Sequence, residues 1–232
     1  MNLKVVVHFI DLPGSMDIAE EIVDILISSN LINCADIFIY CNYDINSFAW
    51  LKDKMHIYNN VSLIDHKSSP IEFELSTLFE IKQLCDSTDE EFYVLYLHHK
   101  GASRIGTLKH SPISDWRNYM LYFNVEKWEE CVKSLDEGYD TVGVEWIEKP
   151  TLPKHYSGNF WWATAKYIRS LPVIVRPTDS AHTGKSQFGF KQHYRLDAEM
   201  WIGLSNPKAK TLNNSNIDHY REAYSPHLYR KD

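Results

Sequence analysis

Short continuous runs of apolar and β-branched residues alternate with amphipathic segments along most of this chain. The clearest apolar runs are 3–10, 35–42 and 90–101, and each is typical of a strand that is buried on both faces of a parallel sheet. Between them, segment 16–30 places its isoleucines along one helical face. This alternation predicts an α/β fold with a GT-A-like (Rossmann-like), mostly parallel central sheet flanked by helices.

Further elements follow the same order. No internal repeat and no linker rich in Pro, Gly or Ser divides the chain, so we expect residues 1–232 to form a single domain. Segment 155–172 is expected to form a strand and then a helix. If so, at least one of Phe160, Trp161 and Trp162 faces away from the core. The other expected strands are 59–66 and 139–146, and the other expected helices are 69–88, 115–138 with Ser114 as its cap, and 195–205.

The composition excludes several classes of partner and location. Lys and Arg total 24 against 31 Asp and Glu, a formal charge of −7, which argues against nucleic-acid binding. The N-terminal segment has no signal-peptide core and no run suits a membrane span. The 4 scattered cysteines have no zinc-site spacing and fit a reducing compartment. We therefore expect a cytoplasmic protein, in the host cytoplasm if the source is viral.

Polar residues gather where the predicted strands end, which is where open α/β sheets bind ligands. His8 and Phe9 end the first strand, and Asn42 ends the second. In "YLHHKG", alternation directs His98 and Lys100 to one side and His99 to the other. An imidazole and an ammonium in one crevice suit a diphosphate, and Gly101 would let a ligand approach the backbone. The alternative is a solvated turn.

Other candidate residues lie on later segments. Asp115 is either a carboxylate suited to a helix start or a functional group, and Arg117 could reach a phosphate or a sugar hydroxyl. Asn159 can donate to and accept from sugar hydroxyls, with Trp161 and Trp162 beside it, unless the segment only packs the sheet.

Asp197 and Glu199 lie two residues apart at the start of a short helix, so they do not share a helical face. One could face a pocket as a base while the other is solvated. The motifs of P-loop, dinucleotide, α/β-hydrolase and zincin enzymes are absent from the sequence.

The pieces "YLHHKG", "DWRNYMLYF", "GYDTVGVEW", "HYSGNFWWATAKYIRSLP" and "DAEMWIG", in this order over about residues 90–203, resemble a specific family. It is that of the small GT-A-type glycosyltransferases, which include the N-terminal domain of chlorovirus capsid-glycosylating enzymes and related bacterial polysaccharide transferases. The resemblance implies a hexosyltransferase that moves a sugar from a nucleotide-sugar donor, a UDP-sugar, to a glycan acceptor.

The resemblance also carries expectations for the metal and the chemistry. GT-A enzymes hold Mn²⁺ or Mg²⁺ with a D-x-D motif, where this chain has His98-His99-Lys100. Either Lys100 neutralises the diphosphate, or a divalent metal, Mn²⁺, is held by an imidazole, that of His98, and a carboxylate from elsewhere in the chain. The family's metal-binding tail histidine would correspond to His219, in a segment that lacks the tail's Gly and Lys.

Asp197 or Glu199 takes the chain position of the family's late catalytic acid, in an inverting or a retaining reaction. Two other classes stay open at this point. One is a catalytically silent nucleotide- or carbohydrate-binding module of the same fold, which the missing D-x-D favours. The other is a nucleotidyltransferase, although "HFIDLPGSMD" lacks the usual Gly-rich signature.

Overall fold

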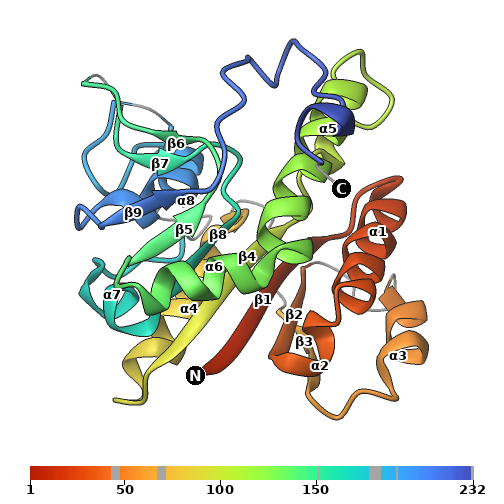
Figure 1. The fold of residues 1–232 in the computed structure, drawn as a ribbon, viewed down its shortest axis with the longest axis horizontal. Coiled ribbons are helices and arrows are strands. Elements are labelled where there is room, and N and C mark those ends of the chain that lie inside the picture. Colours follow the sequence, from red (N-terminus) through yellow and green to blue (C-terminus); the bar gives the residue numbers. More distant parts are fainter. Residues whose placement is uncertain (43–47, 67–71, 151, 178–183, 192, 231–232) are drawn as a thin grey trace.

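One seven-stranded sheet runs through the molecule, in the order β3-β2-β1-β4-β8-β5-β9 (Figure 1). The structure is a computed structural model, and it describes residues 1–42, 48–66, 72–150, 152–177, 184–191 and 193–230. The strands of the sheet are β1 (Asn2–Ile10), β2 (Asp36–Asn42), β3 (Val61–Asp65), β4 (Phe92–His98), β5 (Thr141–Gly143), β8 (Trp161–Thr164) and β9 (Ala209–Thr211). A separate two-stranded sheet pairs β6 (Trp146–Ile147) with β7 (His155–Tyr156).

The sheet is parallel except at β8, which runs antiparallel to both of its neighbours, β4 and β5. The register sets His8 of β1 beside His98 of β4, and Ile10 beside Asn42 of β2. The polar residues that end these strands therefore meet at one edge, as the sequence predicts.

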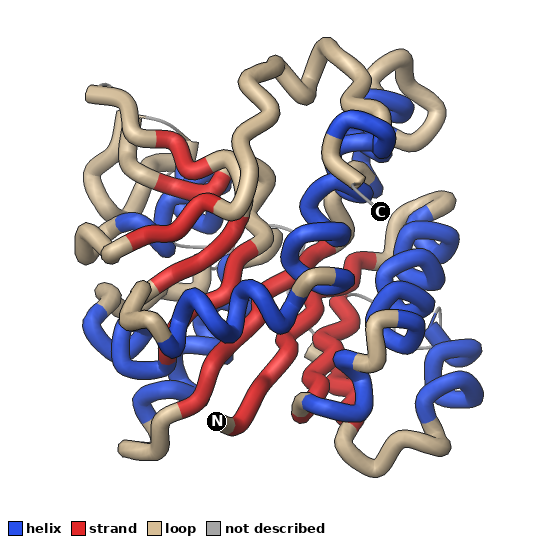
Figure 2. The backbone as a smooth tube through the Cα atoms, in the orientation of Figure 1, coloured by secondary structure: helices blue, strands red, loops and turns tan. Residues whose placement is uncertain are grey.

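Helices cover both faces of the sheet (Figure 2). On one face, Val5 and Val7 pack with residues of α1, α5 and α6. On the other face, Val6 and Tyr96 pack with residues of α4 and α7. The helices are α1 (Ser15–Ser28), α2 (Leu31–Cys34), α3 (Ala49–Met55), α4 (Leu75–Asp86), α5 (His110–Leu121), α6 (Trp128–Asp136), α7 (Ala165–Ser170) and α8 (Asp197–Met200). The expected fold class, an α/β fold with a GT-A-like, mostly parallel sheet flanked by helices, is confirmed.

The aromatic residues of β8 show the consequence of this double covering. Phe160, Trp161 and Trp162 are each 0% exposed. Trp161 packs with the α4 side, while Phe160 and Trp162 pack with the α5 side. The expectation that one of them faces away from the core was wrong, because both faces of this sheet are core.

The segment after β4 also differs from the sequence prediction. Helix α5 begins at His110, so Ser114 is not its cap and Asp115 does not lie in its first turn. The expected helix 115–138 is not continuous, because a π-helical turn at Tyr122–Glu126 separates α5 from α6. Strand β9, which lies within the polar tail, was not predicted. Residues 69–71 of the expected helix 69–88 lie outside the described part of the chain.

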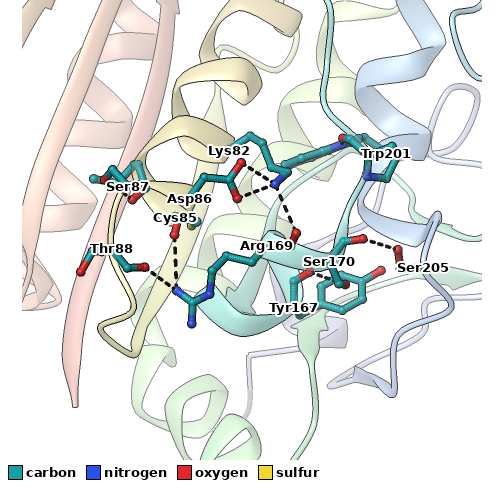
Figure 3. A network of polar contacts seen from close by, with 12 residues as sticks. Lys82, Cys85, Asp86, Ser87, Thr88, Tyr167, Arg169, Ser170, Trp201 and Ser205 are labelled. Carbon is teal, nitrogen blue, oxygen red and sulfur yellow. Dashed lines mark hydrogen bonds and ion pairs between the residues drawn. The ribbon is translucent and has the colours of Figure 1, made fainter.

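A polar clamp fixes α7 against the end of α4 (Figure 3). The buried Lys82 ammonium contacts both carboxylate oxygens of Asp86, at 2.5 and 2.6 Å, and donates to the Arg169 carbonyl at 3.2 Å. The Arg169 guanidinium in turn donates to the carbonyls of Cys85 and Thr88, at 3.4 and 3.2 Å. Carbonyls that α4 leaves free at its C-terminal end thus gain donors.

Among the described residues, no helix has the length and apolar character needed to cross a membrane.

Candidate functional site

Two adjoining cavities lie at the carboxyl ends of β1 and β4. We call them the polar cavity, of about 80 Å³, and the apolar cavity, of about 250 Å³. Both are lined by Glu74, His98, His99, Ser103 and Arg195. The polar cavity adds Lys100, Gly101, Arg104, Ile113, Glu199 and Tyr220. The apolar cavity adds His8, Ile10, Leu12, Phe73 and Ala102.

A buried acid–imidazole pair separates the cavities from the core. His98 Nδ1 lies 3.1 Å from Glu74 Oε1, and His98 Nε2 donates to the Gly158 carbonyl at 3.0 Å. Both ring nitrogens of His98 therefore face oxygen atoms of the protein. Burial alone would raise the pKa of Glu74, but the charge and hydrogen bond of His98, with His8 and Lys100 nearby, hold that pKa well below its usual range.

Asn159 supports this pair from the other side. Its Nδ2 donates to Glu74 Oε2 at 3.3 Å, and its Oδ1 accepts from Trp161 Nε1 at 3.0 Å. Asn159 is 0% exposed, so it positions Glu74 and does not line either cavity. Trp162 Nε1 donates to the Asn124 carbonyl at 2.8 Å within the core. The structure thus places both expected sugar-binding indoles in the core.

The end of β1 supplies a neutral imidazole. His8 Nδ1 lies 2.8 Å from Thr77 Oγ1 and 3.5 Å from Asn42 Nδ2. Burial lowers the pKa of His8 to about 3, against the opposing effect of the Glu74 charge. The other side-chain atom of Asn42, Oδ1, lies 3.2 Å from His66 Nδ1, so the network extends to His66. Of these groups, only His8 lines either the polar or the apolar cavity.

His99 lines both cavities, although the sequence assigned it to the far side. Its ring stacks on Phe9 with centroids 4.3 Å apart, so Phe9 supports the site from behind. Its Nδ1 accepts from the Ile10 N–H at 3.0 Å. Burial lowers the pKa of His99 well below its usual value, so its ring is neutral.

Lys100 follows the end of β4, so strand alternation no longer decides its direction. Its ammonium lies 4.1 Å from the centre of the Trp116 ring and 5.7 Å from that of Tyr220, and the residue is 7% exposed. It still lines the polar cavity together with His98, as the sequence predicts. Aromatic faces stabilise a cation there without neutralising it.

Arg117 and Gly101 shape the turn that carries Lys100. Arg117 is buried, pairs with Glu21 and donates to the Lys100 carbonyl at 2.9 Å. It lines neither cavity. Gly101 has φ +96°, and a Cβ there would lie 2.9 Å from Ile113 Cγ2. Close packing against α5 is therefore sufficient to explain this glycine.

The two candidate catalytic acids have different surroundings. Asp197 is 0% exposed, and its carboxylate accepts from Ser186 Oγ and, at 2.9 Å, from the Gln187 N–H. Glu199 lines the polar cavity. Only Glu199 is placed to reach a bound ligand. Asp115 is half-buried in the second turn of α5 and lines neither cavity.

His219 belongs to a different cluster from His98. Its ring stacks on Trp116 at 5.2 Å, and its Nε2 lies 2.9 Å from Ser215 Oγ and 3.7 Å from Glu145 Oε1. Both nitrogens of His98 already have protein partners. In the described part of the chain, no group of three or more His, Cys, Asp or Glu side chains could hold a metal ion. These residues as placed therefore do not fit a divalent ion held by His98 and His219.

A family model described as a domain of unknown function (DUF8361) matches residues 43–210. The chain belongs to this family. No curated protein matches it.

Two solved structures are similar to the chain. HddC from Yersinia pseudotuberculosis is 14% identical with a TM-score of 0.39, over 74% of this chain and 80% of that one. The second is a protein from Desulfovibrio desulfuricans G20 that is described as a nucleotide-diphospho-sugar transferase. It is 10% identical with a TM-score of 0.38, and the match covers 92% of this chain and 81% of that one. At these low TM-scores the fold assignment rests on the sheet topology itself, and the likeness to chlorovirus enzymes stays a prediction.

Sequence reasoning missed several cavity residues. Glu74 directly precedes α4, where an acid is easily interpreted as a helix-start residue. Arg195 lies two residues before Asp197, the first of the two candidate catalytic acids. Arg104 lies in the segment that follows β4. One feature of the sequence could have pointed to Glu74 and Arg104 as site residues. Glu74 directly precedes α4 and Arg104 follows β4, and both segments meet the carboxyl edge of the sheet.

Together these groups can bind a ligand that has an apolar end and an anionic end. The apolar cavity offers Ile10, Leu12 and Phe73. The polar cavity offers cations and the carboxylate of Glu199. A carboxylate beside a bound ligand can accept a hydrogen bond or a proton from a hydroxyl.

Proposed function

We propose that this protein is a glycosyltransferase that moves a sugar from a UDP-sugar to a hydroxyl group of a glycan acceptor. The observation that carries the proposal is the pair of joined cavities at the carboxyl edge of the sheet, one apolar and one lined by cations and Glu199. A nucleotide sugar has the same division, because its base is flat and largely apolar while its diphosphate is anionic.

The nucleobase would occupy the apolar cavity, against Ile10, Leu12 and Phe73. The diphosphate would lie in the polar cavity near Lys100. This orientation leaves the sugar close to Glu199, whose carboxylate shares that cavity. Glu74 and His98, which line both cavities, would set the position of the donor.

The transfer step would use Glu199 as the base. The acceptor hydroxyl oxygen forms a bond to C1 of the donor sugar, and its proton passes to the Glu199 carboxylate. The bond from C1 to the diphosphate oxygen breaks, and its electron pair leaves with UDP. Cations near the diphosphate stabilise the charge that develops on the leaving group.

Thermal unfolding with nucleotides tests the choice of donor. A ligand that binds only the native state stabilises it by about 2.7 kcal/mol at a hundred times its Kd. We expect UDP to raise the Tm more than GDP or CMP at equal concentrations. Equal shifts from all three nucleotides would reject the uridine assignment, and no shift from any would reject nucleotide-sugar binding.

A donor-hydrolysis assay separates the enzyme from a silent binding module of the same fold. The enzyme should slowly release UDP from one UDP-sugar in water, and faster with a suitable glycan. A chain that binds UDP-sugars tightly but never releases UDP from any of them would be a binding module.

A further inference from the structure

The side chains at the end of β4 leave no open ligand set for a divalent ion among the described residues. Both nitrogens of His98 are engaged, by Glu74 and by the Gly158 carbonyl. The second Glu74 oxygen accepts from Asn159 at 3.3 Å. His99 Nδ1 accepts from the Ile10 N–H, and its Nε2 is enclosed without a partner. A metal ion here would have to break this buried network, at a cost for each hydrogen bond lost.

In the described part of the chain, the same cavity holds cations that form no direct ion pair with an acid. Lys100, Arg104 and Arg195 line the polar cavity. No ion pair within the described residues involves any of them. Two are held by aromatic rings instead: Lys100 lies 4.1 Å from Trp116, and Arg195 lies 4.9 Å from Phe73. Their positive charge therefore remains available to a ligand.

The charges of the polar cavity leave a positive surplus. The two Glu74 carboxylate oxygens already contact His98 and Asn159, which leaves Glu199 as the remaining acid of the cavity against Lys100, Arg104 and Arg195. The diphosphate of a nucleotide sugar carries one negative charge on each phosphate, so it matches this surplus. Arginine and lysine are the side chains that bind phosphate oxygens most strongly.

We propose that Lys100, Arg195 and Arg104 bind the donor diphosphate directly, in place of a divalent metal ion. The proposal rests on the proposed function and deepens it, because it assigns the diphosphate site and its independence of metal. Lys100 is the fixed member, since the Arg117 guanidinium bonds to its carbonyl at 2.9 Å. Arg104 and Arg195 are exposed and lie at the cavity wall.

Isothermal titration with UDP tests this site without any need for turnover. We compare metal-free protein in EDTA with protein in Mn²⁺, for the wild type and for Lys100→Met and Arg195→Met. Methionine keeps the apolar stem of each side chain and removes only its charge. We expect the wild-type Kd to stay within about twofold between the two buffers, and each variant to raise it about tenfold or more in both, the range for a charge-assisted contact.

Lys149→Met is the matched control, because Lys149 is an exposed lysine outside both cavities. Its Kd for UDP should equal that of the wild type. If Lys149→Met weakens UDP binding as much as Lys100→Met and Arg195→Met do, the assignment of the diphosphate site is overturned. UDP binding that requires Mn²⁺ would overturn the proposal and leave the proposed function standing. Absence of UDP binding in both buffers would instead overturn the proposed function. If Lys100→Met fails to fold, the exposed Arg195→Met still decides.

Discussion

Asp197 and Glu199 stand two residues apart but lie in different surroundings. Glu199 lines the polar cavity, whereas Asp197 is enclosed and accepts hydrogen bonds from Ser186 and Gln187. We expect Glu199→Gln to lower turnover about 10²-fold or more, because the base is lost, while the Tm and the UDP Kd stay unchanged. Steady-state kinetics and UDP titration measure both effects.

Asp197→Asn is the matched comparison, since it changes the same kind of group in the same helix. It should lower the free energy of unfolding by about 1–3 kcal/mol, because a buried acceptor of two hydrogen bonds is altered. Urea unfolding measures this. Should Glu199→Gln keep full turnover, the catalytic base must be another group.

His8 gives stability a dependence on pH. Its pKa falls from 6.5 to about 3 on folding, so below pH 6.5 the unfolded chain binds a proton that the folded chain does not. Stability is therefore lost as the pH falls through this window, by at most about 1.4 kcal/mol per pH unit for this one group. His8→Gln should flatten the pH profile of the unfolding free energy.

The exposed His227 supplies the control for this measurement. His227→Gln should leave the profile as steep as in the wild type. Identical slopes for His8→Gln and the wild type would show that His8 is not held neutral in the fold. His99, which burial also holds neutral, should keep part of the slope in either variant.

At the scale of single residues, the sequence predicted strand-end residues better than their directions. His8, His98, Lys100 and Gly101 do line the cavities, because parallel strands end at a common edge. Glu74 was missed because its partner, His98, lies far away along the chain and only the fold brings them together.

At the scale of elements, the clamp between α4 and α7 is open to direct test. Arg169 donates to the carbonyls of Cys85, Thr88 and Glu90, which no other donor in the clamp reaches. Arg169→Ala should lower the free energy of unfolding by about 1–3 kcal/mol, because the partly buried carbonyls of Cys85 and Thr88 lose this donor. Chemical unfolding measures the loss.

Arg221 is the control arginine, because its side chain is 84% exposed in an ion pair with Asp218. Arg221→Ala should change stability by less than about 0.5 kcal/mol. If Arg169→Ala is equally silent, the contacts of its guanidinium with these carbonyls contribute little to stability.

The elements also show why boundaries are harder to predict than their type. Apolar periodicity identified β1, β2 and β4, whose side chains are buried on both faces. It misplaced the start of α5, because the first turn, from His110, carries no apolar stripe. It missed β9, whose half-buried residues "AKT" have no strand pattern and pair with β5 through tertiary contact.

At the scale of the whole molecule, the sheet order explains which conclusions the sequence could reach. The strands β3, β2, β1 and β4 come from residues 2–98 and alternate with helices, so their parallel pairing follows from that alternation, whereas their spatial order does not. The other half mixes directions and draws on distant segments. The C-terminal tail then crosses from β9 to α5, where His219 stacks on Trp116 (Figure 1). Such long-range pairings leave no local pattern in a sequence.

The antiparallel β8 lies between β4 and β5 although it follows both in the chain. During synthesis, β4 is complete at His98, but its outer edge gains its partner only when Trp161–Thr164 has been made. An apolar strand with an open edge is a site for pairing with other chains. The nascent protein therefore passes through a stage in which one edge of β4, a strand whose residues are all buried in the finished fold, is unprotected, and at that stage it would depend most on chaperones.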